Sequence, residues 1–229
     1  VVLNLSPRSE SRPPLRIGVV GTGALGRHHV RILSTLPGVE LVGIVDANAE
    51  QAKAIAAEHG ATVLPSIEAL AELAEAAVVA VPTVAHPEVG CALAERGLHL
   101  LIEKPLAASL AEADALIAAA DRAGRVLAVG HVEFHNPAVT ALVELALSPR
   151  FIEIERLGVF SPRSLDVDVV LDLMIHDLQI LHALDPSPVA EIRATGIAVL
   201  SPKIDIASVR IELESGCVAN LTASRVSAE

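Results

Sequence analysis

Residues 16–26 read RIGVVGTGALG and decide the fold of the chain. The apolar run predicts a buried strand, and glycines at the spacing G-x-G-x-x-G predict a tight turn into a helix. The first glycine permits the turn, the second lets the backbone approach a pyrophosphate, and the third allows the helix to pack closely on the strand. The helix N-terminus would then present free N–H groups to the phosphates. The candidate cofactor-binding residues of this loop are Gly21, Thr22, Gly23, Ala24, Leu25 and Gly26.

An acidic residue follows the second predicted strand. Asp46 lies twenty residues beyond Gly26, where a carboxylate would accept hydrogen bonds from a ribose diol. Residues 47–49 contain no arginine that could neutralise a 2′-phosphate, which favours NAD over NADP. The alternative is a glycine turn beside an incidental aspartate.

Outward from this loop, short apolar runs alternate with amphipathic ones up to residue 130. The strands are expected at Arg16–Val20, Val39–Val45, Thr62–Leu64, Ala77–Val81, Leu98–Ile102 and Arg125–Val129. The helices between them are expected at Ala24–Leu36, Ala49–His59, Ser66–Ala74, Pro87–Arg96 and Ser109–Ala123. Strands separated by single helices predict a doubly wound parallel sheet of the α/β class, a dinucleotide-binding Rossmann domain over residues 15–130.

The pattern changes after Gly130. Helices are expected at Asn136–Leu147 and Asp168–Leu184, and strands at Phe151–Phe160, Val189–Val199, Asp205–Glu214 and Cys217–Ser224. This order predicts a second, α+β domain over residues 131–229 with an open, mainly antiparallel sheet. Residues 1–14 are expected to form a loose tail, or the chain is a fragment.

Composition excludes several classes of protein. The 229 residues carry a formal net charge of −11 without a basic cluster, so we expect no nucleic-acid partner. The longest stretch free of charged side chains, Ala76–Pro87, is twelve residues, whereas a membrane span needs about 20. Two cysteines, Cys91 and Cys217, are expected to be small buried side chains in a reducing compartment. The opening residues do not resemble a secretory signal, so we expect a cytoplasmic protein.

Two groups of residues are candidates for catalysis. Lys104, between Glu103 and Pro105, ends a parallel strand, where it would reach the cleft beside a nicotinamide; the alternative is a solvated lysine. Glu103 and Lys104 are also candidate cofactor-binding residues. Asp172 and His176 lie four residues apart on one predicted helix, so the carboxylate would orient an imidazole that takes a proton from an alcohol. The alternative is a structural histidine in the core or on the surface. No third ligand accompanies this pair, so we expect no metal site.

A further group follows the fourth predicted strand. Pro82 and Thr83 would border the cofactor, and His86 would either contact it or cap the next helix. Four histidines without a carboxylate at useful spacing are interpreted as structural or surface residues: His28, His29, His59 and His99. His131 and His135, at the domain junction, are left open.

Four separated elements occur in one order: GTGALGRHH, VPTVAH, EKPLA and DVVLDLMIHDL. In this order they resemble the glucose-fructose oxidoreductase, inositol dehydrogenase and rhizopine catabolism (Gfo/Idh/MocA) family over residues 15–225. The resemblance implies an NAD(P)-binding Rossmann domain and a C-terminal domain whose open sheet holds a sugar or cyclitol and often forms the dimer interface. It also implies that Lys104, Asp172 and His176 are catalytic. The chain is most similar to members that oxidise nucleotide sugars, such as UDP-N-acetylglucosamine 3-dehydrogenases.

The chain departs from the family pattern at two places. Residues 134–137 read FHNP where the family commonly has RFNP, which alters a basic contact near the cleft. Family members also continue past Glu229, so the second sheet is expected to expose an apolar face and an unpaired edge, unless a partner chain covers them. The resulting hypothesis is hydride transfer to and from a sugar hydroxyl carbon. The alternatives are an NAD-binding sensor or pseudoenzyme without catalysis, and an interaction module that does not bind NAD.

Overall fold

The computed structural model describes residues 13–145, 148–161 and 165–227. The chain divides into two compact units, one up to Gly130 and one from His131 onward. Each unit is a fold of its own and is described separately. Most of the predicted tail, residues 1–12, lies outside the described residues.

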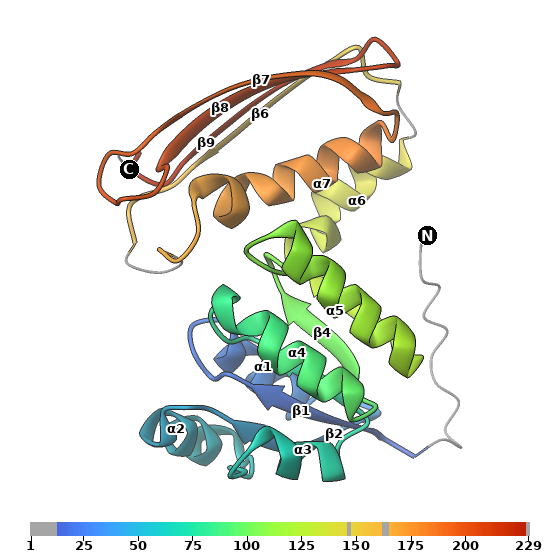
Figure 1. The fold of residues 1–229 in the computed structure, drawn as a ribbon, viewed down its shortest axis with the longest axis vertical. Helices are drawn as coiled ribbons and strands as arrows, with labels where there is room; N and C mark the ends of the chain where they lie inside the picture. Colours follow the sequence, from blue (N-terminus) through green and yellow to red (C-terminus); the bar gives the residue numbers. More distant parts are fainter. Residues whose placement is uncertain (1–12, 146–147, 162–164, 228–229) are drawn as a thin grey trace. The chain divides into compact units, whose positions relative to one another are not determined.

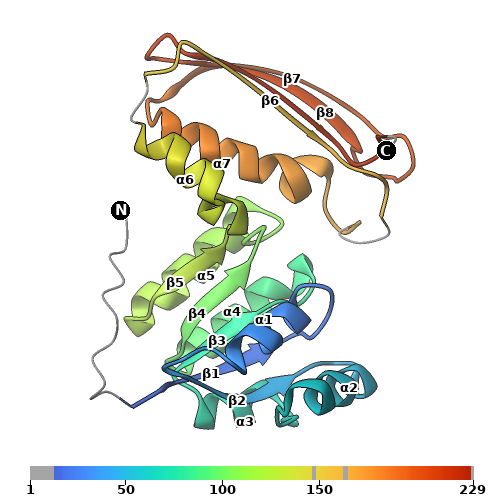
Figure 2. The same cartoon turned by 180° about the vertical axis from the view of Figure 1, so that it is seen from behind.

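The first unit is a five-stranded sheet in the order β2-β1-β3-β4-β5, in which every pairing is parallel. Its strands are β1 (Leu15–Val20), β2 (Val39–Val45), β3 (Ala76–Val79), β4 (His99–Glu103) and β5 (Leu127–Gly130). Its helices are α1 (Gly26–Leu33), α2 (Ala49–His59), α3 (Ile67–Leu73), α4 (His86–Glu95) and α5 (Leu110–Ala123). Helices cover both faces of the sheet (Figures 1 and 2), so the predicted doubly wound fold is confirmed.

The two faces of this sheet have separate apolar cores. On one face Leu70 of α3, Leu93 of α4 and Leu116 of α5 pack on the strands. On the other face the core includes Val30 of α1 and Ala56 of α2. Strand side chains that are buried on both faces explain why the strands are continuous apolar runs in the sequence.

The ends of these helices follow from the sequence. The side chains of Asn48, Ser66 and Ser109 accept hydrogen bonds from the first turns of α2, α3 and α5. Several boundaries differ from expectation by one to three residues, and one expected strand does not form. Residues 62–64 form only an isolated bridge between Val63 and Ile44, and no strand. Helix α1 begins at Gly26 and not at Ala24, since residues 21–25 form the glycine turn.

The second unit is a four-stranded sheet in the order β6-β9-β8-β7. Its strands are β6 (Phe151–Leu157), β7 (Val189–Ile197), β8 (Ile206–Leu213) and β9 (Val218–Ser224). Its helical segments are η2 (Val132–His135), α6 (Pro137–Glu144), the π-helical turn η3 (Val170–Met174) and α7 (Ile175–Leu184). Strands β6 and β9 are parallel and the other two pairings are antiparallel, which confirms an open, mainly antiparallel sheet.

Only one face of the second sheet packs against helices of the described chain. Met174 and Leu181 contact alternate residues of β8 and β9, such as Ile211 and Leu221. The helices α6 and α7 lie along this side in Figures 1 and 2. Every residue of the edge strand β7 is exposed.

The opposite face differs from the apolar surface expected from the sequence. Cross-strand pairing brings Glu153, Asn220, Arg210 and Arg193 into one row across its centre. Exposed apolar side chains such as Phe151 remain at its ends. The centre of this face is therefore polar, because the alternation in each strand directs its charged residues outward.

A buried ion pair anchors the connection between β7 and β8. The carboxylate of Asp205 accepts hydrogen bonds from three successive backbone N–H groups, those of residues 199–201, at 2.7–2.8 Å. Its second oxygen lies 2.8 Å from Nε of Arg225, and both side chains are buried. Burial raises the pKa of Asp205, but these bonds and the Ser201 hydroxyl outweigh it and hold the pKa far below its ordinary value.

Within the described ranges, no helix is both long and apolar enough to span a bilayer. Both cysteines are free thiols; Cys217 is buried and Cys91 is half-buried. Burial raises the pKa of each thiol.

Candidate functional site

The glycine turn between β1 and α1 has the geometry expected of a phosphate loop. Gly21 has a φ of +89°, and a Cβ on it would lie 2.6 Å from the carbonyl oxygen of Ala80. A Cβ on Gly26 would lie only 1.9 Å from the carbonyl oxygen of Gly21. Gly23 is different, because the nearest atom to a Cβ at that position would be Nε2 of Gln51, at 4.0 Å. The protein itself thus requires glycine at positions 21 and 26, whereas position 23 borders open space.

Asp46 faces this turn from the end of β2. One carboxylate oxygen accepts hydrogen bonds from the Thr22 N–H at 2.6 Å and from the Thr22 hydroxyl at 2.7 Å. The other oxygen accepts a bond from the N–H of Asn48 at 2.8 Å. Burial raises the pKa of Asp46, but these hydrogen bonds outweigh it and hold the pKa below its ordinary value. Asp46 is therefore an anion held against the glycine loop.

The residues of this loop fit a dinucleotide. The open side of Gly23 leaves room for a diphosphate beside the backbone, and α1 begins three residues later with its N-terminus at the loop. Thr22 is fully buried and holds Asp46, while Leu25 is exposed and borders the loop. A carboxylate at the end of β2 is an acceptor for the ribose next to the diphosphate. These positions agree with the donor and acceptor pattern of NAD.

Residues 82–86 follow β3 at the same sheet edge. Pro82 leads into a short 3₁₀ turn over Thr83–Ala85, and Thr83 is buried. The ring of His86 is also buried, with Nδ1 at 2.9 Å from the carbonyl oxygen of Pro105 and Nε2 at 3.0 Å from that of Val81. His86 thus contacts the backbone on two sides. Since α4 begins at His86, the first turn of α4 lies next to the Glu103–Pro105 segment.

Lys104 lies at the end of β4 in a half-buried position. Its neighbour Glu103 makes a hydrogen bond that sequence reasoning missed: Oε1 of Glu103 lies 2.7 Å from Nε2 of His29. His29 was interpreted as a histidine without a carboxylate partner, because the two residues are 74 positions apart. A Cβ on Gly130 would lie 3.0 Å from the Glu103 carboxylate, so the strand β5 closes the other side.

In the second unit, Asp172 and His176 lie where a π-helical turn passes into α7. Asp172 belongs to the turn and is half-buried, while His176 is in the first turn of α7 and is 6% exposed. The expected uninterrupted α-helix is therefore wrong over Val170–Met174. Asp168 begins this segment, since its carboxylate accepts hydrogen bonds from the N–H groups of residues 170 and 171 at 3.0 Å. Such π-helical turns occur frequently at functional sites.

The surroundings of His176 include a second histidine ring and, at the next position of the chain, a buried carboxylate. The ring of His131, which the sequence left open, lies edge-on to the ring of His176 with centroids 6.0 Å apart. Asp177, the next residue in α7, is buried and forms a double hydrogen bond with Arg156 of β6 at 2.8–3.1 Å. The bond to Asp177 raises the pKa of the Arg156 guanidinium. Among the residues that the structure describes, no group of three potential ligands could hold a metal ion.

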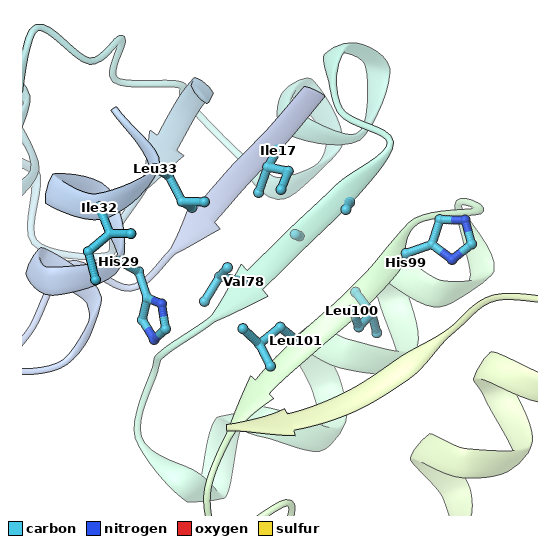
Figure 3. A pocket seen from close by; sticks show the side chains of 10 residues that line it. Ile17, His29, Ile32, Leu33, Val78, His99, Leu100 and Leu101 are labelled. Carbon is cyan, nitrogen blue, oxygen red and sulfur yellow. The ribbon is translucent and has the colours of Figure 1, made fainter. Parts of the chain in front are cut away.

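A separate pocket lies on the α1 side of the first sheet (Figure 3), with a cavity volume of about 350 Å³. Its walls are mainly apolar and come from α1, β1, β3 and β4, with Ile32, Val78 and Leu101 among them. No residue that the sequence analysis proposed for the cofactor lines it. His29 does, and Figure 3 shows it projecting from α1 beside the strands.

The comparisons with known proteins agree with this geometry. Residues 15–131 match the family model GFO_IDH_MocA, described as an oxidoreductase family with an NAD-binding Rossmann fold. A curated relative, UDP-N-acetylglucosamine 3-dehydrogenase of Acidithiobacillus ferrooxidans, is 42% identical over 93% of this chain and 67% of its own length. Myo-inositol dehydrogenase Hyg17 of Streptomyces leeuwenhoekii is 31% identical over 92% of this chain and 70% of its own.

Among solved structures, the UDP-N-acetylglucosamine 3-dehydrogenase GnnA from Acidithiobacillus ferrooxidans is similar along most of the chain. It superimposes with a TM-score of 0.89 at 41% identity, covering 95% of this chain and 72% of that one. The chain thus spans about two thirds to three quarters of these relatives.

Proposed function

The chain belongs to the Gfo/Idh/MocA family of NAD-binding oxidoreductases, and on this premise we propose that it transfers a hydride between NAD and a hydroxyl-bearing carbon of a nucleotide sugar. The observation that carries the proposal is the glycine turn with Asp46 held against it, because a dinucleotide uses both features. The similarity to a UDP-N-acetylglucosamine 3-dehydrogenase supports a nucleotide-activated amino sugar, and that to inositol dehydrogenases makes a cyclitol the second choice.

The residues proposed for cofactor binding divide by role. The turn from Gly21 to Gly26 would receive the diphosphate, Asp46 the adenosine ribose, and Pro82 and Thr83 would border the cofactor further along. Since no basic side chain follows Asp46 in residues 47–49, we propose NAD and not NADP. When bound, NAD supplies the carbon that accepts or releases the hydride.

The residues proposed for proton transfer are Lys104 in the first unit and Asp172 and His176 in the second. His176 would take the proton of the hydroxyl group as the hydride leaves the same carbon, so that a carbonyl group forms. Asp172 would orient the imidazole, and Lys104 would donate a hydrogen bond to the reacting oxygen and stabilise its developing negative charge. The two units would then serve as cofactor domain, residues 15–130, and substrate domain, residues 131–229.

Two ligand assays test the proposal in order. NAD is first titrated by calorimetry, because the chain has no Trp or Tyr for a fluorescence assay. Absorbance at 340 nm is then followed with UDP-N-acetylglucosamine and with myo-inositol as candidate substrates. Reduction of NAD with the nucleotide sugar supports the proposal. NAD binding without reduction by either compound supports the sensor or pseudoenzyme alternative, and absence of binding contradicts both.

We also propose that the protein forms a homo-oligomer through its second sheet. The exposed edge strand β7 and the outward row of Glu153, Arg210 and Arg193 support this, since opposite charges in one row can pair with a second copy. Light scattering coupled to gel filtration measures the mass, and a monomer at 10–100 μM, a range in which about micromolar affinity would show, would contradict the proposal. A cytoplasmic location stays a prediction.

A further inference from the structure

The segment Glu103-Lys104-Pro105 is held by a histidine on each side of the lysine. His29 contacts the residue before Lys104, and His86 contacts the residue after it. Neither histidine is near Lys104 in sequence, and they come from two different helices, α1 and α4. One contact is to the Glu103 carboxylate and the other is to the Pro105 carbonyl oxygen, so the residues on both sides of Lys104 are bonded to helices.

The contact with Glu103 fixes the start of the turn. The His29 and Glu103 side chains are 24% and 12% exposed, so their hydrogen bond of 2.7 Å is largely screened from water. Gly130 lies against the other side of the carboxylate, where any Cβ would crowd it. Glu103 is thereby held between α1 and β5. Since α1 begins at the glycine loop, the same bond joins the phosphate-binding helix to the strand end that carries Lys104.

The contact with Pro105 fixes the end of the turn. His86 is 1% exposed and has a carbonyl oxygen at each ring nitrogen, Pro105 at 2.9 Å and Val81 at 3.0 Å. Pro105 has no N–H of its own, so its carbonyl is the group through which its backbone can be bonded here. Carbonyl oxygens only accept, so an N–H at Nδ1 donates to Pro105 and joins the start of α4 to the segment after β4.

We propose that His29 and His86 are positioning residues that fix the turn carrying Lys104 and thereby direct its ammonium group. The proposal rests on the function proposed above for Lys104. Each histidine would act through a neighbour of the lysine, His29 through Glu103 and His86 through Pro105. Directing a lysine ammonium to one place costs backbone and side-chain entropy, and a turn that is already fixed has lost the backbone part on folding. A displacement of about 1 Å at a catalytic group can lower the rate by about 10²-fold.

The first test observes Lys104 without cofactor or turnover. The chain has three lysines, Lys53, Lys104 and Lys203, so reductive ¹³C-methylation gives few side-chain signals, and Lys104→Arg assigns the one of interest. We expect His29→Leu to move the Lys104 signal toward that of the exposed Lys53, and His29→Gln, whose amide can donate in place of Nε2, to leave it near its wild-type position. His28→Leu is the matched control, since His28 is the exposed neighbour on the same helix.

His86 is tested in the same way with a conservative partner. His86→Asn places an amide donor near the position of Nδ1 and should keep the Lys104 signal, whereas His86→Leu should move it. Because His86 is buried, circular dichroism first establishes that each variant is folded. If His86→Leu does not fold, His86→Asn still tests the proposal. An unmoved Lys104 signal in His29→Leu, or equal movement in His29→Leu and His29→Gln, would overturn the proposal.

The second test separates turnover from cofactor binding. With the substrate found above, His29→Leu should lower kcat by about 10- to 100-fold while the KM for NAD stays within about twofold of wild type, and His29→Gln should recover most of kcat. A merely structural role would lower kcat and raise the KM for NAD together, and that result would overturn the proposal. If the wild type shows no dehydrogenase activity but the Lys104 signal responds as expected, the proposed function fails and the positioning role is supported.

Discussion

Two glycines of the loop, Gly23 and Gly26, offer a direct test of how the first unit binds its cofactor. They are three residues apart and each can be changed to alanine, which adds one methyl group. A methyl group on Gly26 would lie 1.9 Å from the carbonyl oxygen of Gly21, while a methyl group on Gly23 meets only Nε2 of Gln51 at 4.0 Å. The protein itself thus limits position 26, and we expect the bound cofactor to limit position 23.

The expected magnitudes follow from these distances. Gly26→Ala cannot be accommodated unless the loop moves, and overpacking of this kind costs about 1–3 kcal/mol. For a chain of this size that corresponds to a decrease in Tm of about 2–12 °C. Gly23→Ala should leave Tm unchanged or slightly raised, because alanine restricts the unfolded chain by about 0.4–1 kcal/mol. A methyl group facing the diphosphate at the same cost of about 1–3 kcal/mol should weaken NAD binding by about 5- to 150-fold.

Thermal unfolding by calorimetry and NAD titration by calorimetry measure both quantities for both variants. We expect Gly26→Ala to lose stability and NAD affinity together, and Gly23→Ala to lose only affinity. Wild-type NAD affinity in a folded Gly23→Ala variant would refute the placement of the diphosphate beside Gly23. A wild-type Tm for Gly26→Ala would refute the close approach of Gly21 and Gly26.

Four further predictions concern charged and catalytic side chains. Hydrogen bonds lower the pKa of Asp46 in the folded protein. The contribution of the Asp46 carboxylate to the free energy of unfolding should therefore be complete above the ordinary carboxyl pKa of about 3.9 and be lost as the pH falls through the lower folded value. Tm measured against pH should show the wild type and Asp46→Asn converging only in acid. His176→Ala should lower kcat by about 10²- to 10⁴-fold, and Lys104→Ala should lower kcat while calorimetry shows unchanged NAD affinity. Arg156→Met should leave Asp177 as a buried unpaired carboxylate and cost about 3–5 kcal/mol, measured by urea denaturation.

Matched controls exist for two of these variants. His182 is the exposed histidine of α7, so His182→Ala should keep full kcat. Arg193 forms an exposed ion pair with Glu191, and Arg193→Met should cost less than about 1 kcal/mol. Equal losses in control and test variants would contradict the roles assigned to His176 and Arg156. For Asp46, a constant difference in Tm from neutral to acid pH would contradict the assignment.

The parallel sheet and the glycine turn could be predicted from the sequence because their determinants are local. The spacing of Gly21, Gly23 and Gly26 and the caps at Ser66 and Ser109 act within a few residues. The carboxylate of Asp46 could be placed because parallel strands end at one edge of the sheet. Its bonds to the hydroxyl and N–H of the loop threonine needed coordinates.

The parts that could not be predicted depend on residues far apart in the chain. His29 and Glu103 meet only because α1 packs beside the end of β4, and no pattern within either segment indicates this. The π-helical turn over Val170–Met174 reads as ordinary α-helix, since its apolar spacing is the same. The apolar face expected on the second sheet came from the comparison with longer family members, whereas the register that brings Glu153, Arg210 and Arg193 into one row needed coordinates.

The anchoring of residues 199–201 by Asp205 has a consequence for how that loop behaves. Val199 and Leu200 expose their side chains, yet their amide hydrogens point into a buried carboxylate. Solvent can therefore reach the surface of this loop without reaching its amides, and deuterium uptake there should lag behind that of other equally exposed connections. Substitution of Val199 or Leu200 should therefore cost little, because their side chains face solvent, whereas loss of the Asp205 carboxylate should release the backbone of residues 199–201.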